Sequence, residues 1–405
     1  MLKSIKNHYE LQGFLILSII AGVSYGILQF VIPLYASSIK ITDSKIGLIC
    51  GLAQIGSLVM NLPAGFLIDR FSAGKMTVIG GVLNVLILLA IPFASTPILL
   101  VIFLFLEGAA RTIGMIALNS AYINRLGKFG YSRAGWLRAI MSVGMNLMAP
   151  LISGYMIGNA AYSAIFFLVG AVTFLPVPVL IIYRKSNRKE ISRQEKPVAY
   201  SENVKIGSGI KELAKNKEFL RLAIFQSIVI AGITSFPTFI LLLVVNKLEY
   251  SPGTASLMLT FQGIGFILIM FYGGKLIERI NLESLYVLGF SVKLAGLILV
   301  GFFKQLGAIW AGTLLFGLGT ALLTSMSYNL LAKTNGSKGK VAGFYYLFMG
   351  AAGVLAPIYC GVLVGIFGIE SAFIGLIPFD IAAVAFFAAG IFKQAKGIKY
   401  DDIQV

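Results

Sequence analysis

The sequence predicts an all-α membrane protein in which twelve transmembrane helices form two pseudo-symmetric six-helix bundles. Three observations support this fold class. Of the 405 residues, 58% are hydrophobic and only 12% are charged, whereas soluble domains carry about 25% charged residues. Long apolar runs recur along the whole chain, and two motifs of the first half return in the second half in the same order.

The apolar runs have the length of about 20 residues that a helix needs to cross a bilayer. In the first half they cover residues 12–36, 44–68, 76–94, 98–124, 134–157 and 161–183. In the second half they cover residues 218–246, 252–273, 284–303, 306–332, 341–366 and 370–392. Because twelve is an even number, both termini are expected on the same side of the membrane.

The repeated motifs divide the chain into two homologous halves. Residues 65–70 read GFLIDR and residues 274–279 read GKLIER, at an offset of 209. Residues 149–158 (APLISGYMIG) and 356–365 (APIYCGVLVG) are offset by 207. Solenoid proteins repeat every 20–50 residues or so, so this period is too long for them. It is typical of a transporter built from two bundles around a central site.

The basic residues predict which side of the membrane the termini occupy. With both termini in the cytoplasm, 27 of the 33 Lys and Arg residues fall in cytoplasmic segments. Lys40, Lys45, Lys247 and Lys304 fall in extracellular segments, and the remaining two, Arg111 and Lys293, lie within the spans. This bias follows the positive-inside rule. The net charge of +17 is therefore explained by topology and by contact with anionic lipid, and no nucleic-acid partner is expected.

Several other classes of function are disfavoured by the composition. Two cysteines cannot form a disulfide framework, and one histidine makes a His-based metal site improbable. The P-loop pattern GxxxxGK[ST] is absent from the sequence, so ATP is not expected to drive the protein directly. We expect no enzyme activity, no cofactor and no metal.

Four segments are expected along the chain. Residues 1–183 form the N-terminal bundle and residues 217–392 the C-terminal bundle. Residues 184–216 form a polar cytoplasmic linker whose end reads as an amphipathic helix on the membrane surface. Residues 393–405 form a cytoplasmic tail.

The second motif carries small residues and a proline at matching places in both halves. Gly154 and Gly361 begin small-xxx-small pairs, which allow membrane helices to approach closely. Pro150 and Pro357 are expected to break the same helix at the same point in each half, because proline removes one helical hydrogen bond.

The first motif resembles the signature loop between helices 2 and 3 of the major facilitator superfamily of secondary transporters. The matching residues are Gly65, Leu67, Asp69 and Arg70, while Ser72 and Ala73 stand where the family has glycine and a basic residue. Gly274, Leu276, Glu278 and Arg279 form the weaker second copy. The resemblance extends over the whole chain.

The resemblance implies that this loop is a conformational latch. Asp69 would cap the start of helix 11, near residues 339–343, and Glu278 would cap helix 5, near residues 133–135. A carboxylate interacts favourably with the positive end of a helix dipole. The alternative is an ordinary charged turn.

Helix 5 resembles the motif of exporters in this family, whose core reads Gly-Pro-x-x-Gly-Gly. Ala149, Pro150, Ser153 and Gly154 occupy that core, and Gly144 lies one residue out of register. The resemblance suggests export and implies that Pro150, Gly154, Pro357 and Gly361 contribute to gating by helices 5 and 11. The alternative is generic packing of small residues.

Helix 4 contains Glu107 and Arg111, which share a helix face with Glu in the favourable N-terminal position. Charges near the bilayer centre are costly and are usually functional. Arg111 resembles the family's helix-4 arginine in the substrate and proton pathway, and Glu107 could take up a proton. The alternative is a self-neutralising pair that only holds helices together.

Span 1 has no acidic residue, unlike many proton-driven drug exporters of the family. Uncharged polar residues on several spans suit an amphiphilic or polar solute instead, although each could equally make a helix–helix hydrogen bond. The candidate cavity residues are Tyr25, Gln29, Asn119, Gln226, Thr234, Thr238 and Tyr328, with Phe30 and Tyr35 nearby in span 1. Two further charges, Lys293 and Asp380, are expected to pair in a structural role rather than to serve transport.

The sequence therefore predicts a proton-coupled exporter of a small organic molecule that works by alternating access. The substrate is expected to be drug-like, or a metabolite such as a metallophore or siderophore. The partners are the substrate, protons and lipid, and the protein is expected to be a monomer in the cytoplasmic membrane of a bacterium or archaeon. An importer of a small organic solute or metal chelate, and a membrane receptor that does not transport, are the alternatives.

Overall fold

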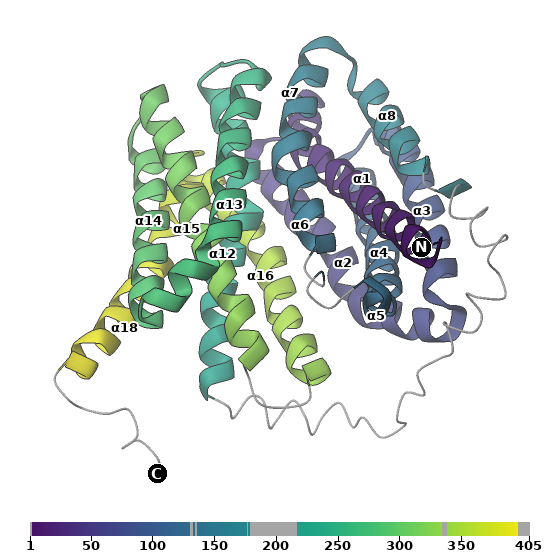
Figure 1. Cartoon of the computed structure of the whole chain (residues 1–405). Coiled ribbons are helices and arrows are strands. Elements are labelled where there is room, and N and C mark those ends of the chain that lie inside the picture. Colours follow the sequence, from purple (N-terminus) through teal and green to yellow (C-terminus); the bar gives the residue numbers. More distant parts are fainter. Residues whose placement is uncertain are drawn as a thin grey trace. The chain divides into compact units, whose positions relative to one another are not determined.

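The structure, a computed structural model, describes residues 2–129, 133, 136–175, 177–178, 217–333 and 338–395. Within these ranges the chain is helical and contains no strand (Figure 1). The predicted linker, its amphipathic helix and nearly all of the predicted C-terminal tail lie outside the described residues.

The chain divides into two compact units. Unit 1 comprises Met1–Val204 together with Val244–Leu257, and unit 2 comprises Lys205–Leu243 and Met258–Val405.

Most of unit 1 comes from the first half of the chain. The elements of that half are α1 (Leu2–Ser38), α2 (Asp43–Phe71), α3 (Ala73–Ala90), the 3₁₀ turn η1 (Ile91–Phe93), α4 (Pro97–Ile123), α5 (Leu126–Phe129), α6 (Trp136–Val143), the π-turn η3 (Gly144–Met148), α7 (Ala149–Asn159) and α8 (Tyr162–Phe174).

Most of the second half of the chain belongs to unit 2. Its elements are α12 (Lys217–Leu242), the π-turn η4 (Leu243–Lys247), α13 (Pro252–Arg279), α14 (Leu282–Phe302), α15 (Leu306–Lys333), α16 (Lys338–Phe367), α17 (Ser371–Ile374) and α18 (Ile377–Ala395). All of η4 beyond Leu243, and the start of α13 through Leu257, group with unit 1.

Eleven of the twelve predicted spans are helices long and apolar enough to cross a membrane within the described residues. The sixth span is described only as the shorter apolar helix Tyr162–Phe174, because most of the residues that follow it lie outside the described ranges. Large apolar side chains on the helix surfaces, such as Tyr155 and Ile98, are exposed. This is the surface expected where lipid, rather than water, surrounds the protein.

The two units repeat the same pattern of helix pairs. In unit 1, α3 packs on α4, α1 packs on the α6–α7 segment, and α3 packs on α8. In unit 2, α14 packs on α15, α12 packs on α16, and α14 packs on α18. Each pair in the second set is the sequence repeat of a pair in the first set, so the internal repeat read from the motifs is also a repeat of packing.

The two repeated prolines behave differently. Pro150 follows the π-turn Gly144–Met148, so the helix is interrupted there as predicted. Pro357 lies inside the continuous helix α16, and the predicted break at this position is wrong. The π-turn inserts an additional residue where proline removes a donor, whereas α16 continues with one backbone hydrogen bond missing.

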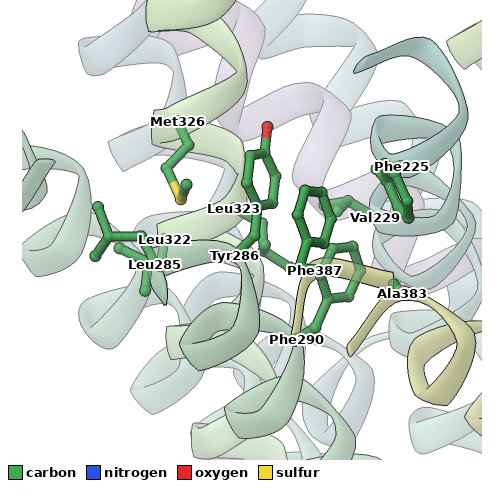
Figure 2. Packing of buried hydrophobic residues seen from close by; sticks show 10 residues of the cluster. All are labelled: Phe225, Val229, Leu285, Tyr286, Phe290, Leu322, Leu323, Met326, Ala383 and Phe387. Atoms are coloured by element: carbon green, nitrogen blue, oxygen red, sulfur yellow. The ribbon is translucent and has the colours of Figure 1, made fainter. Parts of the chain in front are cut away.

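The interior of unit 2 holds a cluster of apolar side chains from α12, α14, α15 and α18, in which α12, α14 and α18 contribute the aromatic rings. Figure 2 shows the rings of Tyr286 and Phe387 lying face to face, with centroids 4.3 Å apart and an angle of 4° between the rings. Phe225 packs on Phe387 from α12 at a centroid distance of 4.4 Å. Because large aromatic side chains bury much apolar area, this cluster fixes the four helices to one another.

Candidate functional site

The candidate site begins with two charged side chains on α4. The Nε of Arg111 donates a hydrogen bond of 2.9 Å to Oε1 of Glu107. Glu107 is only 5% exposed, and the Arg111 side chain is 18% exposed. The predicted contact between these residues, one helical turn apart, is therefore confirmed.

Arg111 is held by α1 and α2 as well as by its own helix. Its guanidinium carbon lies 4.1 Å from the centre of the Tyr25 ring on α1, a cation–π geometry. Its Nη2 donates to Oγ of Ser57 on α2 at 3.2 Å. The same Ser57 hydroxyl donates to the Gly108 carbonyl oxygen at 3.1 Å. Three helices therefore converge on one guanidinium group.

The hydroxyl of Tyr25 is bound in turn by two amide side chains. Nε2 of Gln29 donates to it at 3.0 Å, and Nε2 of Gln54 donates to it at 3.5 Å. The resulting network joins Glu107, Arg111, Tyr25 and Gln29, which were predicted, with Gln54 and Ser57, which were not. Gln54 and Ser57 lie three residues apart on the predicted span 2, so polar residues on one face of an apolar helix were the available signal.

Small residues let α2 and α4 approach closely enough for these contacts. A Cβ built on Gly56 would lie 1.9 Å from the Phe105 carbonyl oxygen, and a Cβ built on Gly108 would lie 3.0 Å from Oγ of Ser57. A side chain at Gly56 would require a helix to move, and one at Gly108 would press tightly on the Ser57 side chain and on the α2 backbone. Close approach through small residues is the usual way in which membrane helices associate.

The architecture and the network agree with the family to which the sequence belongs. Residues 14–250 and 222–400 match the Major Facilitator Superfamily. The chain belongs to the major facilitator superfamily. It is accordingly a multi-pass membrane protein and a transporter of small molecules.

Two proteins named as resistance proteins resemble parts of the chain. It is 30% identical over 122 residues to the methylenomycin A resistance protein of Bacillus subtilis (strain 168), which covers 29% of this chain and 26% of that one. It is 25% identical over 174 residues to the multidrug resistance protein MdtG of Klebsiella pneumoniae (strain 342), covering 42% of each chain. The matching segments thus span less than half the length of either relative.

Solved structures with the same fold have little sequence identity with this chain. A mutant of the nucleoside transporter NupG aligns with a TM-score of 0.79 at 15% identity, over 93% of this chain and 98% of that one. A bacterial homologue of the human lysosomal transporter Spinster, in an inward-facing and occupied conformation, aligns with a TM-score of 0.73 at 15% identity, over 94% and 96% of the two chains.

Three other residues that were predicted near the cavity in unit 1 lie apart from this network. Asn119 is half-buried on α4, twelve residues beyond Glu107 and so about 18 Å further along the helix. Phe30 is fully buried, and Tyr35 packs against the Phe166 ring at a centroid distance of 5.2 Å. Phe30 and Tyr35 therefore belong to the core of unit 1.

The polar residues predicted in unit 2 are mostly occupied by contacts with the protein. Oε1 of the buried Gln226 accepts a hydrogen bond from the Ser327 hydroxyl. The Thr234 hydroxyl donates at 2.9 Å to the Ile230 carbonyl oxygen of its own helix, and Thr238 is buried. The side chain of Tyr328 lies outside the described residues.

The superfamily's signature loop is described in part. The Arg70 side chain is exposed, with its guanidinium carbon 5.3 Å from the Phe71 ring centre. Ser72 joins α2 to α3 with a φ of 75°. It thus adopts a positive-φ conformation at the position where the family has glycine, which accepts such φ values readily.

The predicted latch contacts themselves remain untested. The side chains of Asp69, Glu278 and Arg279 lie outside the described residues. So do the side chains at the start of helix 11, and two of the residues at the expected cap of helix 5.

The residues predicted for gating by helix 5 meet the start of α13 inside unit 1. The Ser256 hydroxyl donates at 2.6 Å to the Pro150 carbonyl oxygen. A Cβ built on Gly154 would lie only 2.2 Å from the Ser256 Cβ, whereas one built on Gly158 would have no atom within 4 Å. On α16, Gly361 is buried.

Lys293 and Asp380 form the predicted ion pair, with Nζ 2.7 Å from Oδ1. The Lys293 ammonium also donates to the Ile228 carbonyl oxygen on α12 at 3.3 Å. Asp380 stands in the first turn of α18, where the positive end of the helix dipole favours a carboxylate. In the described part of the chain, no three His, Cys, Asp or Glu side chains are grouped so that they could hold a metal ion.

Proposed function

We propose that this protein is a proton-coupled secondary exporter of a small organic molecule, with Glu107 as the proton-carrying group. The observation that carries the proposal is the buried Glu107 carboxylate, which is bound to an Arg111 that has two further supports. A protonated Glu107 would leave Arg111 held by Ser57 and the Tyr25 ring. The site can therefore change its charge without losing its geometry.

Exchange of substrate against protons requires that the two compete for one group. The ionised Glu107 carboxylate accepts strong, charge-assisted hydrogen bonds from N–H or O–H donors of a substrate. Protonation removes the negative charge and turns one of the two oxygens into a donor, which weakens these bonds and so favours release. The Tyr25 ring and the amides of Gln29 and Gln54 suit an amphiphilic solute with an apolar face and several polar groups. Drug-like compounds and metallophore- or siderophore-type metabolites belong to this class.

The direction of transport is proposed from two observations. The helix-5 residues resemble the exporter motif, and the two curated relatives are named as resistance proteins. The distribution of Lys and Arg predicts that both termini lie in the cytoplasm, which sets the orientation of the proposed exporter. The proposal further assigns a monomer in the cytoplasmic membrane of a bacterium or archaeon, with Asp69, Arg70, Glu278 and Arg279 as the latch.

The test uses the purified full-length protein in liposomes that carry a pH-sensitive dye and an imposed pH gradient. A panel of amphiphilic compounds is screened for efflux that consumes the gradient. Glu107→Gln is expected to abolish proton coupling while the protein remains folded. Glu249→Gln, which changes an exposed carboxylate, is the matched control.

Three results would contradict the proposal. Uptake along the proton gradient would indicate an importer, and binding without flux would indicate a receptor. Wild-type pH dependence in Glu107→Gln would remove Glu107 from the mechanism.

A further inference from the structure

A cavity of about 100 Å³ lies inside unit 1 beside the Glu107–Arg111 pair. Its walls come from α1, α3, α4 and α8. Glu107 and Arg111 border it from α4, and apolar side chains form most of the remaining wall. Tyr25 borders it from α1, so the cavity meets the network at these three side chains, whereas its walls on α3 and α8 are not part of the network.

Polar groups nevertheless line the cavity on three helices. Thr77 and Asn84 face it from α3, Ser24 from α1 and Thr173 from α8. The Thr173 hydroxyl donates to Oγ of Ser24 at 2.9 Å. Asn84 Oδ1 is buried and has no hydrogen-bond partner among the described residues. An unsatisfied buried acceptor costs about 1–3 kcal/mol, and a water molecule in the cavity would supply the missing bond.

The cavity has room for more than one water molecule. A single water needs about 10–15 Å³ of such space, so a volume of about 100 Å³ holds several. Glycines at positions 80, 81 and 114 form part of the cavity wall. A Cβ built on Gly80 would lie 2.6 Å from the Gly114 backbone nitrogen, so α3 and α4 are in backbone contact at one edge of the cavity.

The polar groups extend from Glu107 toward one end of α3. Thr77 lies in the first turns of α3, which begins at Ala73. Asn84 lies seven residues further, about 10 Å along the helix axis. The distribution of basic residues predicts that the α2–α3 connection is cytoplasmic. The cavity therefore leads from Glu107 toward the cytoplasmic side.

We propose that this cavity is a water-filled chamber through which Glu107 exchanges its proton with the cytoplasm, on a path separate from that of the substrate. The proposal rests on the proton coupling proposed above. In the release step the O–H bond of protonated Glu107 breaks, a chamber water accepts the proton as hydronium, and the carboxylate pairs with Arg111. The reverse step reloads the group.

Few charged or titratable groups compete with Glu107 for this proton. On its own helix the charged neighbour is Arg111, and α1 presents the Tyr25 ring. Among the described contacts, α2 adds only the uncharged Ser57 and Gln54. The polar groups of α3 and α8 that line the chamber are also uncharged.

Hydration is tested first, without any need for transport. In a full-length Cys50→Ser/Cys360→Ala background, Thr77→Cys and Asn84→Cys are treated in nanodiscs with 2-aminoethyl methanethiosulfonate. Since the reacting species is the thiolate, which needs water, both positions should react at least about tenfold faster than Thr313→Cys. Thr313 is a fully buried threonine on α15 and serves as the matched control. Equal reactivity at all three positions would overturn the proposal.

Proton exchange is tested by narrowing the chamber. Gly114 lies in the chamber wall, and a Cβ built on it would be in van der Waals contact with the α3 backbone at 3.8 Å, so the larger side chain of Gly114→Val narrows the chamber between α3 and α4. Proton-coupled efflux is expected to fall about tenfold, which corresponds to about 1.4 kcal/mol in activation free energy. Substrate–substrate exchange, which moves no net proton, should persist. The control is Gly158→Val, because a Cβ built on Gly158 has no atom within 4 Å. If Gly114→Val fails to fold, Asn84→Leu is used as a second variant.

The outcomes separate this inference from the proposed function. Unchanged coupled efflux in the folded variants, or loss of exchange together with efflux, would overturn the separate path. The Glu107→Gln experiment tests whether Glu107 couples transport to protons. Thiol labelling tests whether the chamber contains water, and its result does not depend on the outcome of the Glu107→Gln experiment.

Discussion

Nζ of Lys293 and Oδ1 of Asp380 lie 2.7 Å apart, with the two side chains 1% and 0% exposed. The pair joins α14 to α18, and its bond to the Ile228 carbonyl oxygen extends it to α12. Its apolar neighbours include Phe316, whose ring centre lies 6.0 Å from Nζ. Oδ2 of Asp380 has no hydrogen-bond partner among the described residues. The arrangement is a buried cross-link between three helices of unit 2.

Removing one member of this pair should destabilise the protein strongly. Asp380→Asn leaves the Lys293 charge buried without compensation, which typically costs about 3–5 kcal/mol. The apparent thermal midpoint of the detergent-solubilised protein, followed by tryptophan fluorescence, should therefore fall by several degrees. Lys304→Met, which removes an exposed lysine, should leave the midpoint unchanged.

Removing both charges separates a structural pair from a transport site. Lys293→Met/Asp380→Leu should recover most of the lost stability and should retain transport, since apolar residues can replace a buried ion pair. A stable double variant without transport would assign the pair a role in the transport cycle.

The Tyr25 ring and hydroxyl make separable contributions to the candidate site. Tyr25→Phe keeps the surface beneath Arg111 but loses the bonds from Gln29 and Gln54, and substrate affinity should weaken by about 0.5–1.5 kcal/mol. Tyr25→Leu also loses the cation–π contact and should weaken affinity by a further 0.5–2 kcal/mol or so. Titration calorimetry with a transported compound measures both steps. Equal affinities in the two variants would contradict a role for the ring.

Gly154 and Gly158 offer a matched comparison on one helix. Gly154→Ala places a Cβ where Ser256 already lies, so transport and the thermal midpoint should both fall. Gly158→Ala has open space and should change stability by less than about 0.5 kcal/mol. Adding Ser256→Gly to Gly154→Ala should restore activity. Failure of that rescue would show that the close approach does not explain the need for glycine.

Ser72 adopts a φ of 75° with a ψ of 143°, a backbone conformation that residues other than glycine rarely adopt and that costs on the order of 1–3 kcal/mol. Ser72→Gly should therefore raise the free energy of unfolding by about 1 kcal/mol. Ser72→Ala retains the strained backbone and should give no gain. A gain in the alanine variant would mean that the hydroxyl, rather than the backbone, is unfavourable.

The sequence predicted those contacts that depend on helical geometry alone. Glu107 and Arg111 meet because residues four apart share a face. Lys293 and Asp380 meet because the fixed rise of two helices brings them to similar depths. Gln54 and Ser57 were missed because their spacing indicates a polar face on an otherwise apolar helix but does not show that this face meets α4. The different behaviour of Pro150 and Pro357 was equally hidden, since both prolines occupy the same repeated motif.

The π-turn at Gly144–Met148 has a consequence for comparing this helix with its relatives. A π-turn closes by i→i+5 hydrogen bonds and so contains one residue more than a turn of α-helix. Gly144 is displaced by one position from the exporter motif, yet a Cβ built on it would lie 2.6 Å from the Ile19 carbonyl oxygen of α1. The glycine thus occupies a close-packing position even though the residue count does not match. The displacement reads as a single-residue insertion that the backbone has absorbed locally, and an alignment of this helix needs a one-residue gap. Excising one residue here would turn everything after Met148 by about 100° and carry Gly154 away from Ser256.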